Sequence, residues 1–280
     1  MRFLKIFSAI FNACITKCIT KVSAMFVAPQ QVVPSSLTEQ HLNAAKLCRD
    51  VYSDSVETTD TFVESKDTGA QATVTLDGTK AIVCFRGSTN CLNDWMHNLK
   101  MCRVPFLTRE HSNPELEVHS GFFIAHNSVK AKIYAKLNDM IKSGKCDSLL
   151  FAGHSAGVVS AISAFDFQND KNIPVEVVTF GAPRVGNAAF AADFNSKIKC
   201  TRIVNDNDGI AHAPLFSGYR HVGRDVIQLR DFAPETRGGQ KLNLWHALVN
   251  FARLDSVADH DIDNYIENME RWLQKERNVE

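Results

Sequence analysis

A serine flanked by two glycines stands at the centre of the segment Gly153-His154-Ser155-Ala156-Gly157. The segment follows a short apolar run, 149–152, and precedes a stretch with helical character, 156–167. A strand, a tight turn and a helix in this order form the context in which G-x-S-x-G makes a nucleophile elbow. The turn lifts the serine hydroxyl above the sheet edge, and any Cβ at the glycine positions would collide with neighbouring backbone. We therefore expect Ser155 to be a nucleophile in acyl transfer, with an ordinary glycine-rich turn as the alternative.

A serine hydroxyl alone is a weak nucleophile, so it needs a base and a carboxylate that orients the base. In folds that carry this elbow, the acid and then the histidine follow the serine along the chain. The histidines after Ser155 are His212, His221, His246 and His260. Asp206 and Asp208 come directly after an apolar run, 202–205, and the carboxyl end of a parallel strand faces the same sheet edge as the nucleophile. The residues alone leave both choices open.

The elements that must position these residues alternate along the chain. Short apolar runs at 149–152, 175–180 and 202–205 are separated by helical stretches at 156–167 and 187–194. This alternation predicts βαβ units and an α/β fold with a mostly parallel central sheet flanked by helices. Before it, runs at 72–76 and 81–85 around Asp77-Gly78 predict a β-hairpin. Helices are expected from a cap at Ser35 or Ser36 to about Tyr52, and from 122 to 143.

The first 35 residues differ from the rest of the chain. They contain no acidic residue, and their basic residues are Arg2, Lys5, Lys17 and Lys21. Apolar residues recur at helical spacing, but the stretch is too short to span a bilayer. A signal peptide, a transit peptide, a basic amphipathic helix on a membrane surface and an ordinary first helix all fit this pattern. We expect residues 1–35 to be a targeting or amphipathic segment with a linker, and residues 36–280 to form one domain.

Composition excludes some classes of function. Basic and acidic residues number 31 each, so the net charge is zero and nothing in it favours a nucleic-acid partner. The eight cysteines form no C-x-x-C pair and no Cys/His cluster of zinc-site spacing, so no metal is expected. Cys91 and Cys102 are spaced for a disulfide, and buried free thiols are the equal alternative.

Several further segments resemble those of class 3 lipases, the fungal-lipase-like group of α/β hydrolases. These segments are F-R-G-S at 85–88, V-H-S-G-F at 118–122, F-G-A-P-R-V-G-N at 180–187, Asp208 with Pro214 six residues on, Y-R-H-V-G at 219–223, and Asp259-His260 followed by Tyr265. In the family, the first ends a strand, the second begins a helix and the fifth is a strand. Together they cover roughly Leu37 to Ile266 in the family's order.

The resemblance implies a role for each matching residue. Ser155 would be the nucleophile, His260 the base and Asp208 the carboxylate that orients it. The backbone N–H groups of Ser88 and Ala156 would form the oxyanion hole. On the same basis, Asp206 and His246 are the less favoured acid and base. A mobile lid is implied between residues 90 and 106, although a packed surface loop fits this segment equally well. The apolar residues of the segment are Trp95, Met96, Leu99, Val104 and Phe106.

The implied activity is hydrolysis of lipid acyl esters, as in a triacylglycerol or monoacylglycerol lipase. Phospholipase A1, galactolipase and feruloyl-type esterase activities are the alternatives within the same chemistry, and a non-catalytic scaffold of this fold is the alternative outside it. The chemistry needs no metal or organic cofactor, because the side chains and oxyanion donors suffice. A lipid or small ester substrate, peripheral membrane contact and a secreted or membrane-associated location are expected. The sequence leaves the oligomeric state open.

Overall fold

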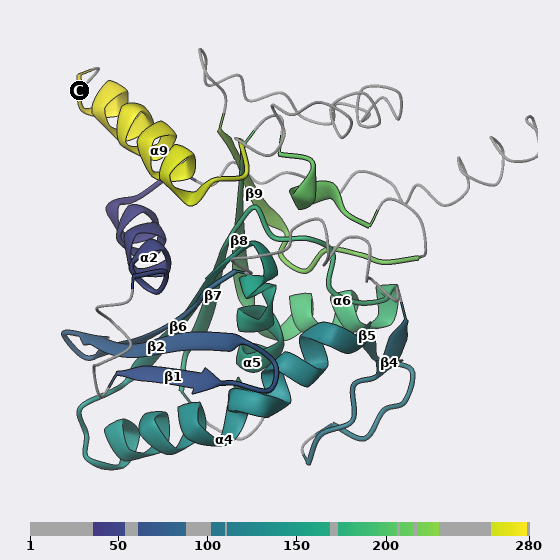
Figure 1. Cartoon of the computed structure of the whole chain (residues 1–280). Helices are drawn as coiled ribbons and strands as arrows, with labels where there is room; N and C mark the ends of the chain where they lie inside the picture. The colour runs from purple at the N-terminus through teal and green to yellow at the C-terminus, as the bar shows by residue number, and fades with distance from the viewer. Residues whose placement is uncertain are drawn as a thin grey trace, which may run out of the picture.

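The computed structural model of the chain describes residues 36–53, 61–87, 102–109, 111–168, 173–205, 208–214, 218–229 and 259–278. Within these ranges the main sheet has seven strands in the order β1-β2-β3-β6-β7-β8-β9 (Figure 1). Their bounds are β1 (Phe62–Ser65), β2 (Ala70–Asp77), β3 (Lys80–Phe85), β6 (Ser148–His154), β7 (Val175–Phe180), β8 (Lys199–Asn205) and β9 (Asp225–Leu229). Strands β1 to β3 pair antiparallel, and β3, β6, β7, β8 and β9 pair parallel. The predicted mostly parallel sheet is confirmed.

Helices cover both faces of this sheet, as an α/β fold requires. On one face lie α2 (Glu39–Asp50) and α9 (Ile262–Arg277), and on the other lie α4 (Ser120–Lys142), α5 (Val159–Gln168) and α6 (Ala188–Lys197) (Figure 1). Two short 3-10 turns, η1 (Ser155–Val158) and η2 (Ile210–His212), come after β6 and β8. A small separate sheet pairs β4 (Arg103–Pro105) antiparallel with β5 (Glu117–His119).

Successive side chains of β6 enter opposite cores. Leu149 and Phe151 join the core beneath α4, α5 and α6, whereas Leu150 and Ala152 join the core beneath α2 and α9. Because side chains along a strand alternate between the two faces, a strand that is covered on both sides must be apolar at every position. This packing explains why the predicted parallel strands are continuous apolar runs in the sequence.

The hairpin and the three parallel strands expected between residues 72 and 205 are confirmed, with slightly shifted ends. Strands β2 and β3 form the hairpin, in which Asp77 pairs with Lys80 and Gly78 takes a positive φ of 59°. The long helix, α4, begins at Ser120, two residues before Phe122. The local signals of turn and periodicity were therefore sufficient for these elements.

The start of the first helix was predicted wrongly. Its N-cap is Thr38, not Ser35 or Ser36. The Thr38 N–H donates a 3.1 Å hydrogen bond to Nδ1 of His41, which gives the first turn a reciprocal cap between these two residues. A histidine in this role replaces the usual Glu or Gln of a capping box, so the sequence pattern did not reveal it.

The segment 219–223, which the resemblance predicted to be a strand, is not one. It makes an isolated antiparallel bridge between Arg220 and Gly186. Gly223 has a φ of 87°, which is incompatible with extended backbone. The strand of this region, β9, begins two residues later at Asp225.

Residues 1–35 lie outside the described residues, so the expected amphipathic or targeting segment stays a prediction. Within the described ranges, no helix combines the length and the apolar character needed to cross a bilayer. Cys102 carries a free thiol, and Cys91 lies outside the described residues.

A buried polar cluster joins α4 to α5, the helix that follows Ser155. The carboxylate oxygen Oδ2 of Asp166 accepts hydrogen bonds from His126 Nε2 at 3.2 Å and the Tyr134 hydroxyl at 3.0 Å, and it pairs with Lys130 Nζ at 2.6 Å. His126 Nδ1 lies 2.9 Å from the Ser163 hydroxyl. Burial alone would raise the pKa of Asp166, but these donors hold it below its ordinary value. Ser163, His126 and Asp166 resemble a catalytic set. Ser163 lies within the helix α5, however, and not in a strained turn at a strand end, and the cluster joins α5 to α4, so we assign it a structural role.

We predict that Asp166→Asn lowers the free energy of unfolding by roughly 3 kcal/mol, because it leaves His126 and Lys130 without their buried anionic acceptor. Urea denaturation measures this loss. The control is Asp193→Asn, which removes an exposed ion pair with Lys197 and should cost less than about 1 kcal/mol. Equal small losses in both variants would contradict the structural role of the cluster.

Candidate active site

Ser155 lies where β6 ends and the turn η1 begins. Its φ is 57°, and among the described residues it is the only one besides glycine with a positive φ. Such a conformation costs about 1–3 kcal/mol and persists only where the surrounding structure holds it. The strand and strained turn predicted around Ser155 are present, although the first turn is a 3-10 helix and α5 begins only at Val159.

The glycines on either side of Ser155 have no room for a side chain. A Cβ on Gly153 would lie 2.0 Å from the Gly157 carbonyl oxygen, and a Cβ on Gly157 would lie 2.7 Å from the Phe85 carbonyl oxygen. Gly87 is restricted in the same way, because a Cβ there would lie 2.8 Å from the Cβ of Ser155. The end of β3 therefore passes directly against the turn that carries the serine.

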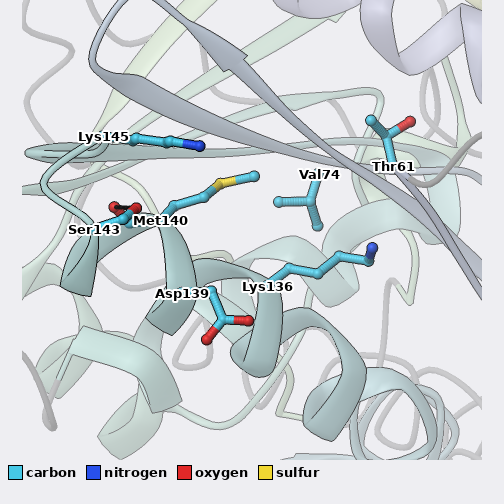
Figure 2. Close-up of a pocket in the computed structure, with 7 residues that line it drawn as sticks. All are labelled: Thr61, Val74, Lys136, Asp139, Met140, Ser143 and Lys145. Atoms are coloured by element: carbon cyan, nitrogen blue, oxygen red, sulfur yellow. Dashed lines mark hydrogen bonds between the residues drawn. The ribbon is translucent and has the colours of Figure 1, made fainter.

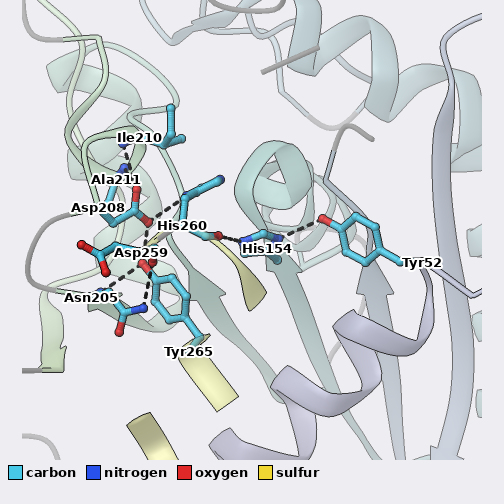
Figure 3. A network of polar contacts seen from close by, with 9 residues as sticks. All are labelled: Tyr52, His154, Asn205, Asp208, Ile210, Ala211, Asp259, His260 and Tyr265. Atoms are coloured by element: carbon cyan, nitrogen blue, oxygen red, sulfur yellow. Dashed lines mark hydrogen bonds and ion pairs between the residues drawn. The ribbon is translucent and has the colours of Figure 1, made fainter. Parts of the chain in front are cut away.

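Asp208 follows the end of β8, and its side chain is fully buried. Its Oδ1 accepts hydrogen bonds from the backbone N–H groups of Ile210 at 2.9 Å and Ala211 at 3.3 Å. Its Oδ2 accepts from His260 Nδ1 at 2.8 Å and from the Tyr265 hydroxyl at 2.6 Å (Figure 3). Four donors thus compensate the burial of the carboxylate and fix its orientation.

His260 lies in the turn that precedes α9, with its imidazole buried. Because a carboxylate only accepts hydrogen bonds, Nδ1 carries the proton in the bond to Asp208. The other ring nitrogen, Nε2, is buried and has no hydrogen-bond partner among the described residues. A neutral imidazole in this tautomer presents a lone pair at Nε2, which is what a general base requires.

His154, the residue before Ser155, connects the serine turn to the histidine loop. Its ring packs against the ring of His260, with centroids 4.8 Å apart, and its Nε2 donates a 2.7 Å hydrogen bond to the His260 carbonyl (Figure 3). Its Nδ1 lies 2.9 Å from the hydroxyl of Tyr52. Burial, together with the neighbouring His260, lowers the pKa of His154 to about 3, so the ring is neutral. The structure thus brings the loops of all three predicted residues together.

Two residues beside Asp208 had been noted in family motifs but without any role. The Tyr265 hydroxyl, which donates to Asp208, also accepts a 3.0 Å hydrogen bond from the Asn205 N–H. Gly181 has a φ of 58°, and a Cβ there would lie 2.5 Å from Asp208 Oδ2 and 3.0 Å from His260 Nδ1. Both residues lie in motifs that resemble those of the family, so the sequence pointed to them. It did not show that they contact Asp208.

Other residues singled out from the sequence lie outside the described residues, and their roles stay predictions. These are Ser88, Trp95, Met96, Leu99, Asp206 and His246. Of the other apolar residues expected in a lid, Val104 lies in β4 and Phe106 is buried in the core, so for these two the packed alternative is correct. Ala156 is half-buried in η1, directly after the serine. Of the candidate imidazoles in the described part of the chain, His260 is the one that hydrogen-bonds to Asp208.

A cavity of about 480 Å³ lies elsewhere on the molecule (Figure 2). It is lined by Thr61, Val74, Lys136, Asp139, Met140, Ser143 and Lys145. Ser143 and Lys145 lead into the start of β6, whereas Ser155 follows the end of the same strand. The cavity therefore lies at the opposite edge of the sheet from Ser155 and is not part of the candidate active site.

Known proteins that are similar to this chain are named as lipases. The chain is similar to a secreted mono- and diacylglycerol lipase from Fusarium solani, with 30% identity over 183 residues that make up 62% of this chain and 52% of the relative. It is also similar to a chloroplastic galactolipase from Arabidopsis thaliana, with 27% identity over 214 residues that make up 66% of this chain and 44% of the relative. The chain thus spans about half the length of these relatives.

The fold has close structural counterparts. The Lip2 lipase of Yarrowia lipolytica matches with a TM-score of 0.67 and 16% identity, over 83% of this chain and 95% of that one. This likeness shows the fold, an α/β-hydrolase fold. Residues 82–218, a range that includes Ser155 and Asp208 but ends before His260, match the family model described as lipase (class 3). This part of the chain, residues 82–218, matches the class 3 lipase family.

Proposed function

We propose that this protein is a serine carboxylic-ester hydrolase in which Ser155, His260 and Asp208 form the catalytic triad. The observation that carries the proposal is the buried hydrogen bond between His260 Nδ1 and Asp208. The second ring nitrogen of His260, Nε2, has no hydrogen-bond partner among the described residues. Leaving a buried polar atom unpaired is costly in a structural role. In a loop that packs against His154, the residue before the strained serine, an unpaired imidazole nitrogen is the arrangement that a general base needs. The match of residues 82–218 to the class 3 lipase family supports the same activity.

In the proposed mechanism, His260 Nε2 takes the proton of the Ser155 hydroxyl as the serine oxygen attacks the ester carbonyl. The bond to the leaving alcohol then breaks, His260 returns the proton to the alcohol, and the acyl group remains on Ser155. Water attacks the acyl carbon by the same route and releases the carboxylic acid. Asp208 holds the tautomer of His260 and stabilises the imidazolium that forms in each half of the cycle.

The developing negative charge on the carbonyl oxygen requires backbone donors. The Ala156 N–H lies at the start of η1, directly after Ser155. The Ser88 N–H follows Gly87, which packs against the serine. We assign these two N–H groups to the oxyanion hole, where each such donor typically lowers the barrier by about 3 kcal/mol.

The proposed substrates are lipid acyl esters, in particular triacylglycerols or monoacylglycerols. The relatives whose names are mono- and diacylglycerol lipase and galactolipase support acyl lipids as the class. Phospholipase A1, galactolipase and feruloyl-type esterase activities are the alternatives. The residues proposed to form a lid over such a substrate are Trp95, Met96 and Leu99.

The proposed organisation places the hydrolase domain at residues 36–280 and a basic amphipathic or targeting segment with its linker at residues 1–35. The secreted and chloroplastic relatives support an extracellular or organellar location. Peripheral contact with a membrane surface would bring the enzyme to its lipid substrate.

Ser155→Ala should reduce kcat on p-nitrophenyl butyrate by a factor on the order of 10⁵ or more, because the attacking oxygen is lost. The same variant should no longer react with a fluorophosphonate probe. The matched control is Ser163→Ala, a buried serine in the α4–α5 cluster, which should keep kcat within about twofold of wild type. Activity retained in Ser155→Ala would refute the mechanism. Folded wild-type protein that neither hydrolyses the ester nor reacts with the probe would favour a non-catalytic relative.

Asp208→Asn should reduce kcat by roughly 10³- to 10⁴-fold. All four partners of the Asp208 carboxylate donate hydrogen bonds to its two oxygens. Asparagine replaces one of these two acceptor oxygens with an NH₂ group, which donates. Facing His260, this NH₂ forces Nδ1 to accept and moves the proton to Nε2, where it blocks base catalysis. Asp166→Asn makes the same change at another buried aspartate and should lower stability but leave kcat nearly unchanged. Similar kcat losses in both folded variants would argue against the role of Asp208.

A series of p-nitrophenyl esters of increasing acyl length separates a lipase from a small-ester esterase. We expect kcat/KM to rise from acetate to medium and long acyl chains, because each buried CH₂ contributes about 0.8 kcal/mol of transfer free energy. A panel of triglycerides, phospholipids and galactolipids then identifies the head group from the fatty acid released. A preference for acetate over every longer ester would contradict the proposed substrate class.

A further inference from the structure

A chain of hydrogen bonds runs from the end of β3, through Tyr52, to the loop that carries His260. The Gly87 N–H donates to the Tyr52 hydroxyl at 2.9 Å, and that hydroxyl lies 2.9 Å from His154 Nδ1. His154 Nε2 lies 2.7 Å from the His260 carbonyl oxygen. Gly87 precedes the predicted oxyanion residue, His154 precedes the nucleophile, and His260 is the proposed base. Figure 3 shows the part of the chain from Tyr52 to His260.

The direction of every bond in this chain follows from its ends. A carbonyl oxygen only accepts, so His154 Nε2 carries the proton and donates to His260. Nδ1 of the neutral ring is then an acceptor, so the Tyr52 hydroxyl donates to it. The hydroxyl oxygen is left to accept from the Gly87 N–H. Each hydrogen bond in this chain therefore has one possible donor and one possible acceptor.

The surroundings hold this arrangement in place. Burial raises the pKa of Tyr52, and burial together with His260 lowers the pKa of His154, so the phenol stays protonated and the imidazole stays neutral around neutral pH. The Tyr52 ring packs against the core beneath α2 and α9, and the guanidinium of Arg86 lies 5.2 Å from the ring centroid. The Tyr52 N–H is bonded to the Arg49 carbonyl at the end of α2. The hydroxyl is thus fixed relative to the sheet.

We propose that Tyr52 is a positioning residue for ester hydrolysis. Its hydroxyl fixes the position of the end of β3, which precedes Ser88, relative to the turn that carries Ser155. This inference rests on the proposed function. Tyr52 does not touch the reacting atoms. It acts through Gly87, which contacts the serine turn, and through His154, which holds the loop of His260. Without the hydroxyl, the Gly87 N–H and His154 Nδ1 lose their common partner, and the two halves of the site can shift relative to each other.

The test is Tyr52→Phe, which keeps the ring and removes the hydroxyl. We expect kcat on p-nitrophenyl butyrate to fall by about 10- to 100-fold with KM within about threefold, because a displaced oxyanion donor weakens binding of the transition state rather than of the substrate. The rate of labelling by a fluorophosphonate probe, which also forms a tetrahedral anion at Ser155, should fall by a similar factor.

The matched control is Tyr134→Phe. It removes a part-buried phenol hydroxyl that donates to Asp166 and to the Ser163 carbonyl in the α4–α5 cluster. It should lower the melting temperature but leave kcat within about twofold of wild type. A folded Tyr52→Phe variant with kcat within twofold of wild type, or with a loss no larger than that of Tyr134→Phe, would overturn the proposal.

A measurement on the wild-type protein keeps the proposal testable if Tyr52→Phe does not fold. NMR of ¹⁵N-labelled histidine should find His154 protonated at Nε2 and accepting at Nδ1 across neutral pH, and the opposite tautomer would overturn the proposal.

Failure of the proposed function is a separate result. In that case the wild-type protein hydrolyses no ester, whereas failure of this inference leaves a Ser155-dependent activity that is indifferent to the Tyr52 hydroxyl.

Discussion

The 2.8 Å hydrogen bond between His260 and Asp208 joins two loops that lie 52 residues apart in the chain. The carboxylate is buried with no exposed surface, so its negative charge is tolerable only because four donors converge on it. One of these donors is the imidazole, and the bond leaves the second imidazole nitrogen as the acceptor of the site. The proposed chemistry depends on this buried pair, because without it the tautomer of His260 would be undefined.

The parallel sheet places the other parts of the site around this pair. Strands β3, β6 and β8 are parallel and all end at the same edge of the sheet. The segments that carry Gly87, Ser155 and Asp208 therefore meet there, although they are far apart in the sequence. Close approach is achieved by omitting side chains. Gly87, Gly153 and Gly181 each lie where a Cβ would overlap a neighbouring atom. The strain at Ser155 is therefore held by packing between the ends of β3 and β6, whereas Gly181 makes room for Asp208 and His260.

Local patterns were enough to predict much of this arrangement. The apolar runs gave β3, β6, β7 and β8, and the glycine–serine segment gave the elbow. Motif order, not any local pattern, selected Asp208 and His260. Strand β9 was missed because its alternation is weak and a glycine with φ of 87° ends the preceding segment. Tyr52 could not be predicted as a site residue, since its partner His154 is 102 residues away and nothing near Tyr52 in the sequence marks the contact.

The most direct test of the central claim is a crystal structure of the wild-type protein after reaction with a fluorophosphonate. Phosphorus should be bonded to Ser155 Oγ, with His260 Nε2 within roughly 3 Å of an oxygen on the adduct and with His260 Nδ1 still hydrogen-bonded to Asp208. A phosphoryl oxygen should face the Ala156 N–H. An adduct on another residue, or one on Ser155 with His260 turned away and no other imidazole in its place, would contradict the account.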